Sequence, residues 1–91
     1  MAISLTNQKS SQALRGEDVV VTLSSAAQSN LASIPVGTQA YINGTSVYGV
    51  VSRVDEYGTS LEISPLAPSK NFASPTHPGY LYGGEVVVFN I

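Results

Sequence analysis

Residues 37–64 decide the fold of this chain and read GTQAYINGTSVYGVVSRVDEYGTSLEIS. Asn43-Gly44 separates two runs with β-forming residues, and Asn-Gly supplies the positive φ angles that a two-residue type I′ hairpin requires. A second reversal is expected at residues 55–58, after which Leu61 and Ile63 alternate with polar residues, as in a half-buried strand. The stretch therefore predicts three strands in a meander.

The middle strand of this meander changes its hydrophobic phase. Val47 and Val51 share one parity, whereas Val50 and Val54 take the other, and Gly49 lies where the phase changes. Glycine inside a strand often marks a bulge or a sharp coil, so a bulge is expected at Gly49. Strongly coiled meanders of this kind are typical of small barrels.

The segment before the meander predicts one strand and one helix. Residues 18–23 contain a Val-rich run, and its apolar residues fall on both parities, so both faces of this strand are expected to be covered. Ser25 and Gln28 have the spacing of a capping box, which predicts a short helix over about 25–33. Pro35 would end that helix, because the residue before a proline is pushed out of the α region.

The segment after the meander predicts a long loop and a final hairpin. Residues 65–79 contain four prolines and are expected to form an irregular Pro-rich loop. Residues 80–82 and 85–91 are expected to pair across a two-residue turn at Gly83-Gly84. The last strand is apolar on both faces, so it must be inserted in a sheet or paired with another chain.

Residues 1–16 predict an N-terminal arm with a short strand near its start, where Ile3, Leu5 and Asn7 alternate weakly with other residues. A frayed terminus and an arm lying on a neighbouring subunit are both compatible with this pattern. Residues 17–91 are expected to form one β-rich domain. The fold class predicted for the whole chain is mainly β, a small barrel or sandwich of about six strands with one short helix and a long Pro-rich loop.

The chain carries little charge. It has 4 basic and 6 acidic residues among 91, or 11% charged residues, against about 25% in an average soluble domain. Free monomers generally keep more charge for solubility, so we expect a surface that other polypeptides cover, and a homo-oligomer. The few scattered basic residues argue against binding to nucleic acid. No signal peptide or membrane span is expected, and the absence of cysteine fits folding in a reducing cytoplasm.

No grouping of residues predicts catalysis, a cofactor or a metal. His77 is the only histidine, there is no cysteine, and the acidic pairs Glu17-Asp18 and Asp55-Glu56 fall at expected turns or strand ends. Asn43-Gly44-Thr45 matches a glycosylation sequon, but the hairpin already explains both the asparagine and the glycine. We therefore expect a protein that is not an enzyme.

Tyrosines are the candidate contact residues. Tyrosine combines a large rigid apolar face with a hydroxyl, which suits protein interfaces and also sugar or peptide grooves. The expected partner-binding residues come from the arm, the Pro-rich loop and the tyrosines: Ile3, Leu5, Tyr41, Tyr48, Phe72, Tyr80 and Tyr82.

In composition and in its pattern of strands and turns, the chain resembles small bacteriophage virion proteins of the capsid decoration or head-to-tail joining kind. The resemblance covers most of the chain and rests on the absence of cysteine, the low charge, the Ala/Ser/Gln/Asn-rich first third and the meander, including residues 49–59. Small host-encoded barrels of the SH3-like type share the same pattern of strands and turns. The resemblance implies a small β domain that is made in the host cytoplasm, joins the virion and stabilises the capsid through contacts with a major capsid or other virion protein. The alternative is a small β-barrel module that binds a peptide or glycan in a groove lined by Tyr41, Tyr48, Tyr80 and Tyr82.

Overall fold

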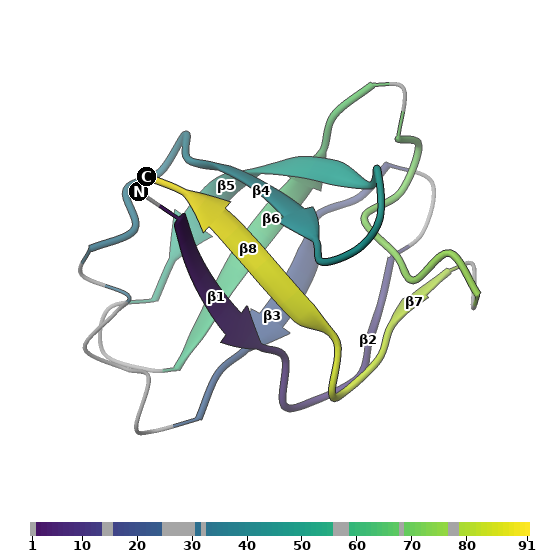
Figure 1. Ribbon diagram of the computed structural model, residues 1–91, viewed down its shortest axis with the longest axis horizontal. Coiled ribbons are helices and arrows are strands. Elements are labelled where there is room, and N and C mark those ends of the chain that lie inside the picture. The colour runs from purple at the N-terminus through teal and green to yellow at the C-terminus, as the bar shows by residue number, and fades with distance from the viewer. Residues whose placement is uncertain are drawn as a thin grey trace.

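The computed structural model describes residues 2–13, 16–24, 31, 33–55, 59–67, 69–76 and 79–91 and has a mainly β fold. The strands are β1 (Ala2–Thr6), β2 (Ser11–Gln12), β3 (Val19–Thr22), β4 (Gln39–Ile42), β5 (Tyr48–Val54), β6 (Ser60–Pro65), β7 (Tyr80–Leu81) and β8 (Val86–Asn90). Six of them form an antiparallel sheet in the order β1-β8-β4-β5-β6-β3, and β2 pairs with β7 in a small second sheet. The large sheet curls into a half-barrel, and the small sheet lies beside it (Figure 1).

The meander is confirmed, because β4, β5 and β6 are consecutive neighbours in the large sheet. The expected two-residue turn at Asn43-Gly44 is wrong. Tyr41 faces Tyr48 in the ladder, and the Ile42 N–H donates to the Val47 carbonyl at 3.1 Å, so the connection spans residues 43–46.

Thr45 explains the wider turn. Its N–H and its hydroxyl both donate to the Ile42 carbonyl, at 3.1 and 2.7 Å, and its Oγ1 accepts from the Val47 N–H at 3.1 Å. Gly44 supplies the positive φ, at 76°. Asn43-Gly44 thus sets where the chain reverses, and the Thr45 side chain sets the register of β4 with β5.

The bulge lies three positions after the expected one. Val51 faces Ile63 and Arg53 faces Glu62, so the ladder skips Ser52, whereas Gly49 pairs regularly. Gly49 is needed for close packing instead. A Cβ at this position would lie 2.4 Å from Ile63 Cγ2, 2.8 Å from the Ser64 carbonyl oxygen and 2.9 Å from Phe72 Cδ2.

The strand expected over residues 18–23 is confirmed as β3, but only one of its faces is covered. Val19 and Val21 are fully buried, whereas Val20 is 38% exposed. β3 lies at one edge of the large sheet and pairs there with β6 alone. The apolar residues of both parities therefore do not mark a strand buried on both faces.

The expected final hairpin is wrong. Glu85 N–H donates to the Tyr82 carbonyl at 3.3 Å, so a turn forms, but β7 pairs with β2 while β8 runs between β1 and β4. The turn passes the chain from the small sheet to the large one. The expectation that the last strand lies within a sheet is confirmed, and Val87 and Phe89 are fully buried.

The segment expected to be an arm contributes strands to both sheets. β1 pairs with β8 over its whole length, and β2 pairs with β7. Ile3 and Leu5 alternate inward as the sequence suggests, because β8, more than 80 positions away, gives them a ladder and a core to face. Figure 1 shows the start of β1 beside the end of β8, where Ala2 pairs with Asn90.

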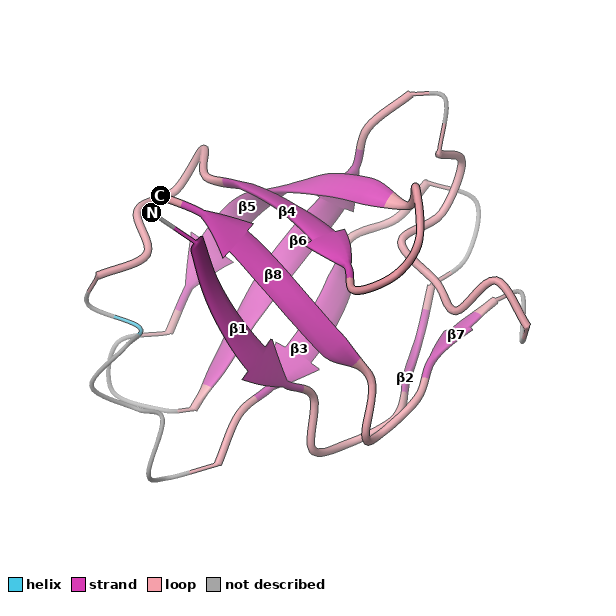
Figure 2. Ribbon diagram, viewed as in Figure 1, coloured by secondary structure: helices cyan, strands magenta, loops and turns pink. Residues whose placement is uncertain are grey.

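Two long connections add residues to the core (Figure 2). The helix expected over 25–33 lies outside the described residues apart from Leu31 and Ser33. Between β3 and β4, Leu31 and Ile34 are buried in the same apolar cluster as the inner faces of the strands. Between β6 and β7, Phe72 joins that cluster. Pro65, assigned to the loop by the sequence, is the last residue of β6.

Candidate interaction surface

The expected contact residues divide into core and surface positions. Leu5 is 8% exposed and Phe72 is fully buried, so these two side chains belong to the core and not to a contact surface. Ile3 is partly buried against the core. Tyr48, Tyr80 and Tyr82 are the exposed members, and Tyr41 is half-buried.

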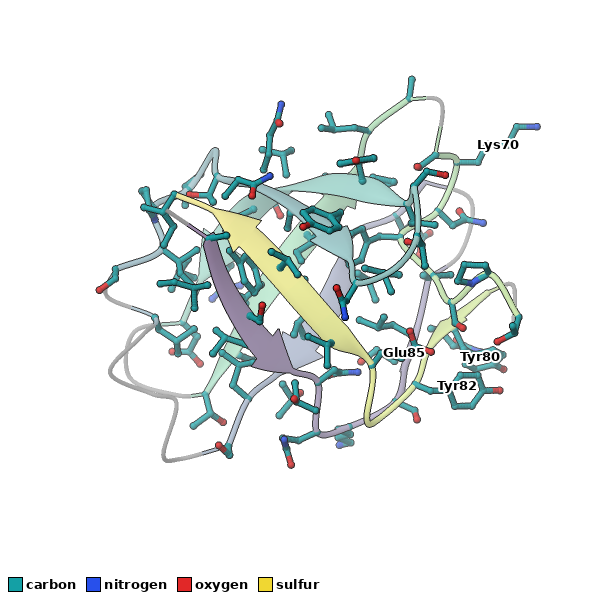
Figure 3. The ribbon with its side chains drawn as sticks, in the orientation of Figure 1. Lys70, Tyr80, Tyr82 and Glu85 are labelled. Atoms are coloured by element: carbon teal, nitrogen blue, oxygen red, sulfur yellow. The ribbon has the colours of Figure 1, made fainter. Side chains whose placement is uncertain are left out.

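Tyr80 and Tyr82 form one exposed aromatic pair. Their ring centroids lie 5.8 Å apart with an interplanar angle of 38°, and the side chains are 40% and 37% exposed. The Gln12 amide donates to the Tyr80 hydroxyl at 3.2 Å across the small sheet. Figure 3 shows both rings side by side at the margin of the molecule. The pair offers apolar ring area flanked by uncharged hydrogen-bonding groups.

Asn7 fixes the backbone that carries this pair. Its side-chain amide donates to the Tyr82 carbonyl at 3.0 Å and to the Leu81 carbonyl at 3.4 Å, and its Oδ1 accepts from the Thr22 N–H at 3.0 Å. Its backbone carbonyl accepts from the Gly84 N–H at 2.7 Å. Asn7 is fully buried, and it therefore ties the ends of β1 and β3 to the segment that presents the tyrosines.

The importance of Asn7 is absent from the sequence-based interpretation, although a signal was present. Asn7 shares the inward parity of Ile3 and Leu5, which places a polar amide where an apolar residue is expected. A buried amide is tolerated only when its donors and acceptors are satisfied, so an inward asparagine predicts a structural junction.

Tyr41 and Tyr48 form the second aromatic pair. They lie opposite each other on β4 and β5, with ring centroids 5.5 Å apart and an interplanar angle of 42°. Tyr41 also lies opposite Val88 of β8, which is buried although its neighbours Val87 and Phe89 face the core. On the outer face of the half-barrel, Tyr41 thus lies between the exposed Tyr48 and the buried Val88.

The four tyrosines do not form one groove. The rings contact each other two by two, one pair on the large sheet and one on the segment that begins with β7. A partly open hollow of about 210 Å³ is lined instead by Val20, Arg53, Asp55, Ser60, Leu61 and Glu62. Its charged rim includes a 3.9 Å contact between the Arg53 guanidinium and the Glu62 carboxylate, which is worth little at such exposure.

Asp18 links three strands at the edge of the large sheet. Its carboxylate accepts hydrogen bonds from the hydroxyls of Ser52 on β5 and Ser64 on β6, and it lies directly before β3. These hydroxyls lower the pKa of the Asp18 carboxyl, and the small desolvation that opposes them is outweighed. The carboxylate is exposed, and its two hydroxyl contacts connect the start of β3 to β5 and β6.

We expect the Asp18 link to give a pH-dependent contribution to stability. Because the carboxyl pKa is lower in the folded than in the unfolded chain, the contribution is full above the unfolded value of about 3.9 and is lost as the pH falls through the folded value. Asp18→Asn should lower the free energy of unfolding by about 1 kcal/mol or less at pH 7, since solvent screens an exposed carboxylate. Urea unfolding of both proteins at pH 7 and at successively lower pH measures this difference, which should shrink as the pH falls.

Glu17→Gln is the matched control, because it removes a neighbouring exposed negative charge that lacks these two serine contacts. A difference between Asp18→Asn and the wild type that stayed the same at every pH would show that the hydroxyl contacts do not act through the ionised carboxylate.

Among the described residues, no three His, Asp or Glu side chains come together in a way that could hold a metal ion. Nor does the described part of the chain contain a helix with the length and hydrophobicity needed to cross a membrane. No protein family matches the sequence, and neither a curated protein nor a solved structure matches the chain.

Proposed function

We propose that the protein is a non-enzymatic virion component, a capsid decoration or cement protein that binds a capsid surface through its tyrosines. The observation that carries this proposal is the pair Tyr80–Tyr82, exposed on a backbone that the buried Asn7 holds in place. Exposed aromatic residues on rigid elements are the usual anchors of protein interfaces, because they bury large area at low cost in side-chain entropy.

The low charge of the chain supports the same function. With charged residues making up 11% of the sequence, few charges need to be desolvated when a partner covers the surface. Ile91 is 44% exposed, which adds apolar area at another point of the surface. Stable attachment would bury roughly 800 Å² on each partner, more than one tyrosine pair provides, so the Tyr41–Tyr48 pair is the second contact element of this proposal.

Co-sedimentation with capsids tests the proposal, using capsids assembled from a major capsid protein encoded in the same genome, which the proposal requires to exist. The wild type should co-sediment with them, and the double substitution Tyr80→Ser/Tyr82→Ser should weaken binding by roughly thirtyfold or more, since an anchoring tyrosine contributes about 2 kcal/mol. Val36→Ser is the control, because it removes exposed apolar area without touching either pair.

Two outcomes would overturn the proposal. One is a wild-type protein that stays in the supernatant at every capsid concentration. The other is a double tyrosine variant that binds as well as Val36→Ser does.

A second candidate is a module that binds a neutral glycan or peptide. The observation that favours it is the Gln12–Tyr80 hydrogen bond beside the ring pair, which combines stacking area with an uncharged donor and acceptor. Binding of soluble oligosaccharides or peptides at the Tyr80–Tyr82 pair, by a protein that ignores capsids, would favour this candidate over the first.

A further inference from the structure

Among the described residues, β1 has a strand partner on one side of its backbone only, and on the other side the Thr6 carbonyl accepts a 3.3 Å hydrogen bond from the Gln8 side-chain amide. It is the first strand of the large sheet and pairs with β8 alone. The Asn7 N–H donates to the Glu85 carbonyl, and in an antiparallel ladder alternate residues bond to the same neighbour. Ile3 and Leu5 therefore bond to β8, whereas the N–H and C=O groups of Ala2, Ser4 and Thr6 point away from it.

The hydrogen bonding between β8 and β4 agrees with this assignment of the outward groups of β1. The Asn43 N–H donates to the Val86 carbonyl, so the even-numbered residues of β8 face β4 and its odd-numbered residues face β1. The side chains of Ala2, Ser4 and Thr6 are exposed as well. Among the described residues, no strand pairs with this side of β1.

The sequence of β1 lacks the usual devices that protect such an edge. Natural edge strands carry lysine, proline or a bulge that prevents pairing with another strand. Ala2–Thr6 reads AISLT, which has no charge and no proline, and its register with β8 is unbroken. The opposite edge of the sheet differs: at β3, Thr22 bonds to Asn7 and Gln8, and Asp18 places a charge at the start of the strand.

We propose that β1 pairs antiparallel with β1 of a second copy of this chain, on a two-fold axis at Ser4. The segment is complementary to itself in this arrangement: Ser4 lies opposite Ser4, and Ala2 opposite Thr6, so each outward N–H meets an outward carbonyl. An uncharged strand brings no like charges together at the axis. The two large sheets become continuous. The β1 edge lies two strands from the Tyr41–Tyr48 pair, with Val88 between Ser4 and Tyr41, and the Tyr80–Tyr82 pair belongs to the segment that begins with β7.

Ser4→Pro is the decisive substitution. Proline removes the outward N–H of residue 4 but leaves the ladder with β8 intact, and proline is tolerated at edge positions whose N–H faces solvent. Sedimentation velocity over a range of protein concentrations should show dimers for the wild type and for Ser4→Ala. For Ser4→Pro, the dissociation constant should rise by about tenfold to a hundredfold, because two hydrogen bonds at the axis are lost.

Thermal unfolding at high dilution checks that Ser4→Pro still folds. Two oppositely charged variants test the register without relying on Ser4→Pro. Ser4→Lys and Ser4→Glu place like charges opposite each other in their own dimers, so each should be monomeric alone, and an equimolar mixture should form heterodimers.

Hydrogen exchange gives an independent measurement on the unmodified protein. The amides of Ser4 and Thr6 should exchange more slowly as concentration rises, whereas the Leu5 amide, already bonded to β8, should not change. A wild type that stays monomeric at every concentration would overturn the proposal. So would dimers that survive Ser4→Pro, or a Lys/Glu mixture that fails to associate. Loss of capsid binding in the tyrosine variant with dimers retained would leave this inference intact and separate it from the proposed function.

Discussion

Asn7→Leu is expected to lower the free energy of unfolding by about 3–5 kcal/mol, a large part of the roughly 5–15 kcal/mol that stabilises a small domain. Leucine has a similar volume, so the change leaves little cavity. It removes the acceptor of the Thr22 N–H and the donor to the Leu81 and Tyr82 carbonyls. The Thr22 N–H is left without its acceptor beside a fully buried position, which costs about 1–3 kcal/mol, and the bonds to the Leu81 and Tyr82 carbonyls are lost as well, although the Tyr82 carbonyl keeps its 3.3 Å bond from the Glu85 N–H.

Urea unfolding followed by circular dichroism measures the effect. Gln8→Leu is the matched control, because the adjacent side chain is exposed and bonds only to the Thr6 carbonyl, at 3.3 Å. It should change stability by about 0.5 kcal/mol or less. Equal effects of the two substitutions would mean that the Asn7 amide does not hold the ends of the two edge strands together.

The parts of the fold that the sequence predicts are those set by local signals. Asn43-Gly44 marks a reversal, and the strands on either side of it pair because they are neighbours along the chain. Leu61 and Ile63 alternate correctly, and both are buried. Chain reversals and the faces of adjacent strands follow from local residue preferences, and here they were sufficient for the meander.

Non-local pairing accounts for the errors. Gly83-Gly84 does mark a turn, but a turn indicates where the chain bends and not which strands pair across it. β7 pairs with β2, and β8 with β1 and β4, and the residues of β1 lie 80 to 88 positions from their partners in β8. No periodicity within residues 80–91 carries that information, so the local hairpin was the simpler prediction and a wrong one.

Among the candidate contact residues, too, local sequence was enough to predict exposure for the tyrosines, whereas the burial of Phe72 depends on packing with a distant part of the chain. Tyr48 at the start of β5, Tyr80 on β7 and Tyr82 just after β7 are exposed, as the sequence predicts for contact residues. Phe72 lies in a proline-rich stretch without a repeating pattern, and only the approach of Gly49 from another strand makes room for its ring in the core. Gly49, which the sequence predicts as the site of a bulge, instead packs closely against the side chain of Phe72, more than twenty positions later in the chain.

Phe72→Ala is expected to destabilise the protein by about 3–5 kcal/mol, because it empties a fully buried ring from the apolar cluster. Chemical unfolding measures it, with Lys70→Ala, an exposed position two residues earlier, as a control that should change stability by about 0.5 kcal/mol or less. A ring that served only as a surface contact would give the opposite result, with stability unchanged and binding lost.

Gly49→Ala tests the same contact from the other strand. Its Cβ would lie within 3 Å of both the Phe72 ring and the Ser64 carbonyl oxygen, so we expect overpacking to cost about 1–3 kcal/mol. Truncating Phe72 removes one of these contacts but not the backbone one. The cost of Gly49→Ala should therefore shrink, without vanishing, when Phe72 is alanine, and a double-mutant cycle measures the difference. Strictly additive effects would mean that the two residues do not pack against each other, and the connection between β6 and β7 would then have to be held to the barrel by other contacts.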